Sequence, residues 1–294
     1  MRPRDYGPFD YSPIHERPKL TWPGDARVAV WVVPNIEFFS LQERPAGYAA
    51  GKVPDVPMWA ARDYGNRVGV FRLMEVMDRL GYRGSVALNA DLCLHHPQII
   101  EAGNRLGWEW MGHNRTNTQR LNEVPAEAEA TIIRESLEII ARVSGTRPTG
   151  WLGSGLQESW NTLDHLVDHG IEYVLDWCND DQPYEMTLDD RRTILSVPYS
   201  HEINDKPAFE HMHRSAGEFR DMICDAFDVL YREGAASGRV MCIAVHPYLT
   251  GTAHRIDAFA QALEQIRRTP RVWFPTGREI AAAFRAQGGQ ACED

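Results

Sequence analysis

Four ionisable side chains lie at the ends of short apolar segments that have the composition of buried strands. They are Glu37, His113, Asp176 and His246. Carboxylates and imidazoles are the side chains that most often accept and donate protons in enzymes. If the strands that precede them are neighbours in one sheet, these groups meet at one edge and can perform acid–base chemistry.

The elements that would position these residues alternate between short β-branched runs and longer segments of helical period. We expect strands at 27–34, 85–89, 108–112, 149–152, 172–176, 193–198, 239–245 and 272–275, because each run is short, apolar and rich in strand-forming residues. Apolar residues at helical spacing predict helices within 68–81, 125–145, 215–238 and 254–270. Repeated βα units in a chain of 294 residues predict an α/β fold, a single incomplete or distorted β/α barrel with about seven units.

Two connections in this pattern are too long to be simple links between elements. They span about 38–65 and about 177–215. Long loops at the carboxyl end of barrel strands usually form the substrate pocket, so we expect both to contribute to it.

The charge balance narrows the class of partner. The chain has 31 basic and 41 acidic residues, which gives a net charge of −10. This charge disfavours nucleic acid and anionic membranes, and no apolar run approaches the roughly 20 residues needed to span a bilayer. The first 20 residues lack the apolar core of a secretory signal, and the five cysteines show no CxxC pair. We therefore expect a cytoplasmic protein that acts on a small molecule.

The amino-terminal segment differs in composition from the rest. Prolines at 3, 8, 13, 18 and 23 disfavour helix and predict an extended arm. The expected organisation is thus an arm at 1–25, one barrel domain at 26–285 and a polar tail at 286–294. Because the arm needs a surface on which to lie, we predict a homodimer or homotetramer.

The order of these strand-end residues resembles the motif order of the polysaccharide deacetylase superfamily. Its motifs are matched by Glu37, by His113, by Thr146 to Trp151, by Asp176-Trp177 and by His246, and the resemblance covers about 20–280. Within the superfamily, Asn179-Asp180-Asp181, Asn204-Asp205 and His246-Pro247 look like the cofactor-independent allantoinase branch. The resemblance implies an incomplete barrel that hydrolyses C–N bonds other than peptide bonds.

Two positions depart from the metal-dependent members that the chain resembles. Where those members have an acid and a second histidine as metal ligands, this chain has Phe38 and Asn117. Neither side chain offers an anionic oxygen or an imidazole, so the resemblance implies a hydrolase without metal. The alternative is a ligand set for zinc or another divalent ion rebuilt from Glu37, His113 and His201.

Without a metal, the acid and the histidines must activate water and stabilise charge. We expect Glu37 to be the base, with a pKa raised by burial beside Ile36, Phe38 and Phe39, which would give the pH profile an acidic limb. His246 is the expected acid or oxyanion donor, and His113 a second group that polarises the carbonyl.

Other residues are expected to support substrate binding. Asp176 could orient one of the imidazoles. Arg147 could anchor a carboxylate or ureido group, or tether Asp176. Trp151 and Asn204 complete the predicted substrate-binding set, and Asn204 with Asp205 is also expected to shape its loop.

The predicted function is hydrolysis of a linear or cyclic amide in a small polar metabolite, by direct attack of water. A ureide such as allantoin fits the resemblance, whereas the aromatic pair Phe38-Phe39 favours an aromatic amide or a formamide. Two alternatives stay open: a metal-dependent N-deacetylase of an N-acetylated sugar, and a barrel that binds a metabolite without catalysis.

Overall fold

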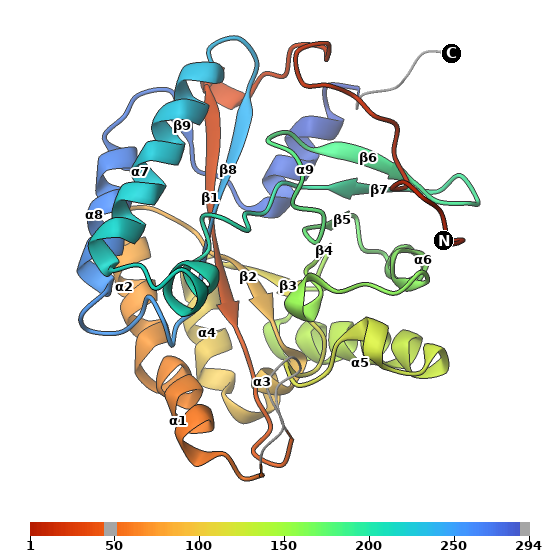
Figure 1. The fold of residues 1–294 in the computed structure, drawn as a ribbon, viewed down its shortest axis with the longest axis vertical. Helices are drawn as coiled ribbons and strands as arrows, with labels where there is room; N and C mark the ends of the chain where they lie inside the picture. Colours follow the sequence, from red (N-terminus) through yellow and green to blue (C-terminus); the bar gives the residue numbers. More distant parts are fainter. Residues whose placement is uncertain (44–51, 289–294) are drawn as a thin grey trace.

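The computed structural model describes residues 1–43 and 52–288, and Figure 1 shows its sheet curling through the middle of the molecule, with helices packed around it. The strands are β1 (Val28–Ile36), β2 (Ser85–Leu88), β3 (Glu109–Gly112), β4 (Gly150–Trp151), β5 (Tyr173–Val174), β6 (Tyr184–Thr187), β7 (Thr193–Ser196), β8 (Arg239–Val245) and β9 (Val272–Trp273). The helices are α1 (Val56–Tyr64), α2 (Val70–Arg79), α3 (Ala90–His95), α4 (Pro97–Arg105), α5 (Ala126–Ser144), α6 (Thr162–Asp168), α7 (Ala216–Glu233), α8 (Ile256–Arg267) and α9 (Gly277–Arg285).

The sheet is an open, curled half-barrel. Its strand order is β6-β7-β5-β4-β3-β2-β1-β8, and β9 pairs with the start of β1. Every pairing is parallel except the β6–β7 hairpin. The incomplete β/α barrel that the sequence predicts is confirmed.

Six of the eight predicted strands are shorter than expected, β1 is longer, β8 has the predicted bounds, and one strand was missed. β4 and β5 have two residues each, where the sequence predicted four and five. β6 was not predicted, because only one of its four positions is buried and the apolar pattern of a strand is missing. The helix expected at 68–81 begins as a π-helical turn, Gly65–Gly69, that leads into α2.

Side chains of β1 alternate between two cores, and this alternation positions the active site. Val28, Val30 and Val32 pack outward against the helices, in a core shared with α2, α7 and α8. Ala29, Trp31 and Val33 point into the barrel, where they meet residues from β3, β5 and β8. Successive side chains of a strand point to opposite faces, so odd-numbered residues of β1 face the barrel interior.

Helix ends in this chain carry recognisable stop and start signals. Ser215 and Glu218 form a capping box at the start of α7, which satisfies free backbone N–H groups there. α5 ends at Gly145, whose φ of 78° is a backbone conformation that favours glycine. These signals agree with the helices expected from the sequence.

The amino-terminal arm lies on the body of its own chain. The Phe9 ring meets Trp177 and Tyr184 edge-on, at centroid distances of 5.6 and 4.9 Å, and Pro8 accepts a hydrogen bond from Thr187 of β6. The surface that the arm requires is therefore present within one chain, and the arm does not by itself argue for an oligomer. The predicted dimer or tetramer stays a prediction.

The long connection and the carboxyl-terminal tail that the sequence predicted are described only in part. Residues 44–51 of the long connection 38–65 and residues 289–294 of the tail lie outside the described residues. Among those described, no helix is both long and apolar enough to cross a membrane.

Candidate active site

Glu37, His113 and His246 meet at the mouth of the barrel because each continues the inward-facing side of its strand. They follow β1, β3 and β8 respectively. Residues of the interior core lie two or four positions earlier on the same strands: Val33, Met111 and Ala244. Since the side-chain period of a strand is two, the three polar side chains converge on one point above that core.

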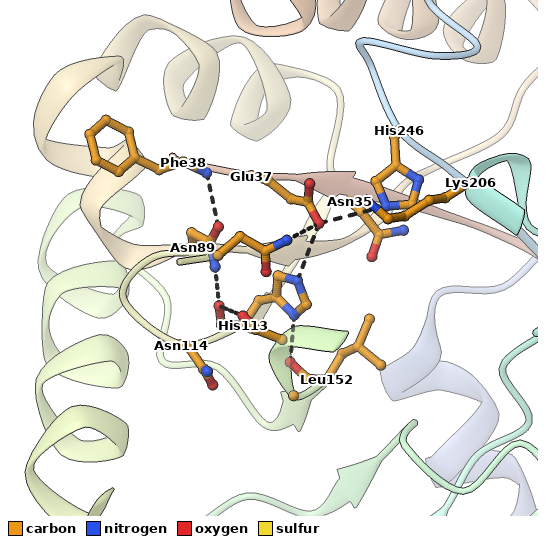
Figure 2. Close-up of polar contacts among 12 residues, drawn as sticks. Asn35, Glu37, Phe38, Asn89, His113, Asn114, Leu152, Lys206 and His246 are labelled. Carbon is orange, nitrogen blue, oxygen red and sulfur yellow. Dashed lines mark hydrogen bonds and ion pairs between the residues drawn. The ribbon is translucent and has the colours of Figure 1, made fainter. Parts of the chain in front are cut away.

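The Glu37 carboxylate is the centre of this cluster, as Figure 2 shows. Its Oε1 lies 3.6 Å from Nε2 of His246 and 3.8 Å from Nε2 of His113, and it accepts a 2.6 Å hydrogen bond from the Asn117 amide. All three acid–base residues are buried, at 6%, 2% and 3% exposure for Glu37, His113 and His246. Their interactions are therefore weakly screened by solvent.

His246 is held in its charged form by carboxylates on both sides. Its Nδ1 lies 2.6 Å from Oδ1 of Asp205. The other Asp205 oxygen accepts bonds from the backbone N–H of His246 and from the Thr250 hydroxyl, at 2.8 and 2.6 Å. Burial opposes the charge, but Asp205 and Glu37 outweigh it and raise the pKa of His246 to about 9.

The pKa of Glu37 is shifted in the opposite direction to the one predicted. Burial alone would raise the pKa of its carboxyl, but the positive charge and hydrogen bond of His246, together with the charge of Lys206, hold it well below its usual range. The predicted upward shift is wrong because the sequence pattern showed the apolar neighbours and not the facing imidazolium. At neutral pH the resting pair is a Glu37 carboxylate and a His246 imidazolium.

His113 is oriented by the backbone. Its Nδ1 lies 2.6 Å from the carbonyl oxygen of Leu152, so the ring donates there and, when neutral, carries a lone pair on Nε2. Asn89 accepts from the Phe38 backbone N–H at 2.9 Å and donates to the His113 carbonyl. This amide joins the segments that follow β1 and β3 and fixes the distance between Glu37 and His113.

Known proteins of similar sequence and fold cover nearly the whole of this chain. No family model matches the chain. A Schizosaccharomyces pombe protein named as a polysaccharide deacetylase is 26% identical over 307 residues, covering 94% of this chain and 95% of its own length. A solved Pseudomonas aeruginosa structure, also named as a polysaccharide deacetylase, has a TM-score of 0.83 at 27% identity and covers 92% and 95% of the two chains. Over nearly its whole length the chain is therefore similar, in sequence and in fold, to proteins named as polysaccharide deacetylases.

A second solved structure of similar fold is named for a different activity. The allantoinase PuuE has a TM-score of 0.83 at 26% identity, and covers 95% of this chain and 98% of its own. The similarity spans nearly the whole of both chains. The named relatives thus include both polysaccharide deacetylases and an allantoinase.

Phe38 and Asn117, which stand where the metal-dependent deacetylases that the chain resembles have metal ligands, do not fit a metal. The Phe38 ring is turned away from Glu37, as Figure 2 shows, and stacks on His95 at a centroid distance of 4.6 Å. The Asn117 amide presents its N–H to Glu37, which is the wrong polarity for a group facing a cation. Within residues 1–43 and 52–288, no group of three His, Cys, Asp or Glu side chains is placed to hold a metal ion.

Asp205, and not Asp176 as the sequence suggested, is the carboxylate hydrogen-bonded to an imidazole. Asp176 accepts a 2.8 Å bond from the Gly153 backbone N–H. Val174, two positions before it, belongs to the core beneath α5 and α6 rather than to the barrel interior. Asp176 therefore starts from the opposite face of its strand to the one that reaches the cluster.

Arg147 and Trp151 also lie apart from the cluster. Arg147 is exposed, precedes β4 and donates to the carbonyl of His169 at 2.8 Å. It sits at the amino end of the sheet, so neither a substrate contact at the cluster nor a tether to Asp176 is found. Trp151 is fully buried in the core with Leu137 and Leu163. Both predictions of substrate binding are corrected on these placements.

Asn204 and His201 follow β7 with different outcomes. Asn204 is buried, donates to the Tyr199 hydroxyl at 3.3 Å and accepts from the Lys206 backbone N–H at 3.0 Å, so it shapes the loop that carries Asp205. His201 is exposed, and in the described part of the chain no contact joins it to Glu37 or His113. The rebuilt metal set that includes His201 does not form.

Sequence reasoning missed Asn89 and undervalued Asp205 and Asn117. Asn89 is the last residue of the predicted strand 85–89, so its place at the carboxyl end was a usable signal. Asp205 lies in a long connection without periodicity, and nothing in the local pattern points to His246. Asn117 was read as a lost ligand, whereas it is a hydrogen-bond donor to the base.

Proposed function

We propose that the protein hydrolyses an amide-type C–N bond in a small polar metabolite, using Glu37 and His246 and no metal. The observation that carries this proposal is the convergence of two imidazole Nε2 atoms and the Asn117 amide on Oε1 of Glu37. Such a buried carboxylate and imidazolium pair supplies the acceptor and the donor that amide hydrolysis needs.

The attacking water would lie between Glu37 and His113. Oε2 of Glu37 and Nε2 of His113 are buried and have no hydrogen-bond partner among the described residues. Each can accept one hydrogen of a water molecule, which leaves the oxygen lone pairs free to attack. His246 lowers the basicity of Glu37, so Glu37 alone holds the water weakly. A second acceptor, Nε2 of His113, fixes the orientation of the water.

The reaction then proceeds without a covalent enzyme intermediate. The water oxygen bonds to the carbonyl carbon while Glu37 takes its proton. The imidazolium of His246 stabilises the developing oxyanion and donates its Nε2 proton to the leaving nitrogen. Cleavage of the C–N bond releases an acid and an amine, and proton exchange with solvent restores Glu37 and His246.

A ureide is the substrate class that we favour. The similarity to an allantoinase over nearly the full length of both chains supports it. The argument for an aromatic amide depended on Phe38, and the ring of this residue stacks on His95 instead of facing Glu37.

The test is a hydrolysis panel of allantoin, other hydantoins, formamides, acetamides and N-acetylglucosamine oligomers, assayed with and without excess chelator. We expect ureide hydrolysis that persists in chelator and is lost in Glu37→Gln. Deacetylation of a sugar that depends on zinc or another divalent ion would overturn the proposal. So would the absence of hydrolysis of every compound in the panel by folded protein.

A further inference from the structure

One peptide group connects His113 to a second buried carboxyl cluster. The carbonyl oxygen of Leu152 accepts from His113 Nδ1 at 2.6 Å. The N–H of the same peptide group, on Gly153, donates to Asp176 Oδ1 at 2.8 Å. Figure 2 shows the first of these bonds. Hydrogen bonds in series polarise one another, so a negative charge on Asp176 strengthens the acceptor that His113 uses.

We propose that Asp176 and Glu158 are positioning residues that fix the tautomer of His113 through the peptide group between Leu152 and Gly153. This rests on the proposed function only in so far as His113 is assigned to the attacking water. Neither carboxyl group touches the reacting atoms.

The two carboxyl groups form a pair that shares one proton. Both Glu158 oxygens and Oδ2 of Asp176 are buried, with no hydrogen-bond partner found in the described part of the chain. Burial raises the pKa of Asp176 to about 6. Burial and the charge of Asp176 raise the pKa of Glu158 well above its usual range. A proton held by Glu158 and donated to Asp176 Oδ2 satisfies the buried oxygens and leaves Oδ1 negative for Gly153.

The backbone at Gly153 permits this close approach. A Cβ at this position would lie 3.2 Å from Oδ1 of Asp176 and 2.9 Å from the carbonyl oxygen of Gln157. Contacts this short are rarely tolerated. Glycine therefore allows the carboxylate to reach the peptide N–H.

The consequence concerns Nε2 of His113. With the proton fixed on Nδ1, a neutral ring presents its Nε2 lone pair toward Glu37, 3.8 Å away. In the other tautomer Nε2 would carry the proton and donate toward Glu37, so it could no longer accept from the water. The relay selects the tautomer that can bind the nucleophile.

The primary experiment measures the ¹⁵N signals of His113 in the full chain without substrate, assigned by comparison with His113→Gln. We expect a protonated Nδ1 and an unprotonated Nε2. In Asp176→Asn we expect the Nε2-protonated form to become measurable, with turnover reduced about tenfold, a usual size for loss of an outer hydrogen-bond partner. A folded Asp176→Asn protein with an unchanged tautomer would overturn the proposal, even if turnover fell.

Two further variants keep the test decisive. Glu158→Gln should remove a protonated-carboxyl band from the infrared spectrum and shift the tautomer in the same direction as Asp176→Asn. If Asp176→Asn does not fold, this variant decides, and a spectrum without that band in the wild type contradicts the shared proton. Glu109→Gln is the matched control, because Glu109 is a buried acid bonded to Ser85 and Tyr173 that should leave the His113 tautomer unchanged.

The readouts separate this inference from the proposed function. The tautomer is measured without turnover, so a protein that hydrolyses no amide can still show the relay. Conversely, amide hydrolysis with an unchanged tautomer in Asp176→Asn would leave the proposed function intact and remove the relay.

Discussion

His246 and His113 flank the same carboxylate, yet their supports differ. Each ring points Nε2 toward Glu37 and uses Nδ1 for an anchoring bond of 2.6 Å. The anchor of His246 is the Asp205 carboxylate, whereas the anchor of His113 is the neutral Leu152 carbonyl. A direct charge raises the pKa of His246 to about 9 and makes it a proton donor. A dipole fixes where the proton of His113 lies and leaves Nε2 available as an acceptor.

The role of each imidazole therefore depends on the group bonded to Nδ1, the ring nitrogen that does not face Glu37. Two histidines with similar burial and similar distances to one acid are thereby given opposite tasks. Variants can separate the support by a charge, from Asp205, from the support by a dipole, from the Leu152 carbonyl.

The largest effect on turnover is expected from replacing Glu37, the group that both histidines face. Glu37→Gln should lower turnover by about a hundredfold to ten-thousandfold, because it removes the base and the counter-charge of His246. His246→Ala should have an effect of similar size, and the double variant should lose less than the product of the two. Steady-state kinetics on the best substrate of the panel tests this, with circular dichroism as the control for folding. Strictly multiplicative losses would show that the two residues act independently.

Asp205→Asn should come next, with turnover reduced by roughly a hundredfold. The amide can still bond to Nδ1, but it no longer stabilises the imidazolium. The loss should exceed that of Asp176→Asn, because Asp205 contacts its ring directly and Asp176 acts through a peptide group. Equal losses from the two variants, measured side by side, would contradict the distinction between charged and dipolar support.

The pH dependence should show the charge state of His246. The pKa of this residue is raised to about 9, so kcat/KM should fall above about pH 9 as the donor loses its proton. Because the pKa of Glu37 is held well below its usual range, Glu37 should give no acidic limb near its ordinary value. In Asp205→Asn the alkaline limb should move to lower pH.

The stability of the folded protein should also depend on the protonation of His246. A raised folded-state pKa contributes stability that is fully present below the ordinary value of 6.5 and is lost as pH rises through about 9. Thermal melting of the wild type across pH 6 to 10 should therefore show a decline that His246→Ala reduces. A decline of the same size in His246→Ala would assign it to another group.

The smallest effect is expected at Arg147. Its side chain is exposed and donates to the His169 carbonyl at the amino end of the sheet, far from the strand ends that carry the cluster. Arg147→Ala should leave kcat and KM within about twofold and change the free energy of unfolding by less than about 0.5 kcal/mol, as is usual for a surface position. A large rise in KM would restore the substrate-binding role that the sequence suggested.

The barrel and the three converging residues can be predicted from the pattern of residue types along the chain. Strand runs and helical periods fix the order of elements, and a side-chain period of two sends Glu37, His113 and His246 inward. The same period, applied to Trp151 and Asp176, points them away from the barrel interior, so their misplacement could have been avoided.

The pairing of carboxylates with imidazoles, and the charge that each group carries, depend on contacts that exist only in the folded chain. Asp205 reaches His246 across a loop whose path no local pattern specifies, and Asp176 reaches His113 only through the backbone of another strand end. The pKa of Glu37 depends on charges brought from β8 and from Lys206. Because electrostatic energies depend on distance and burial in the folded state, residue types along the chain could not set even the direction of that shift.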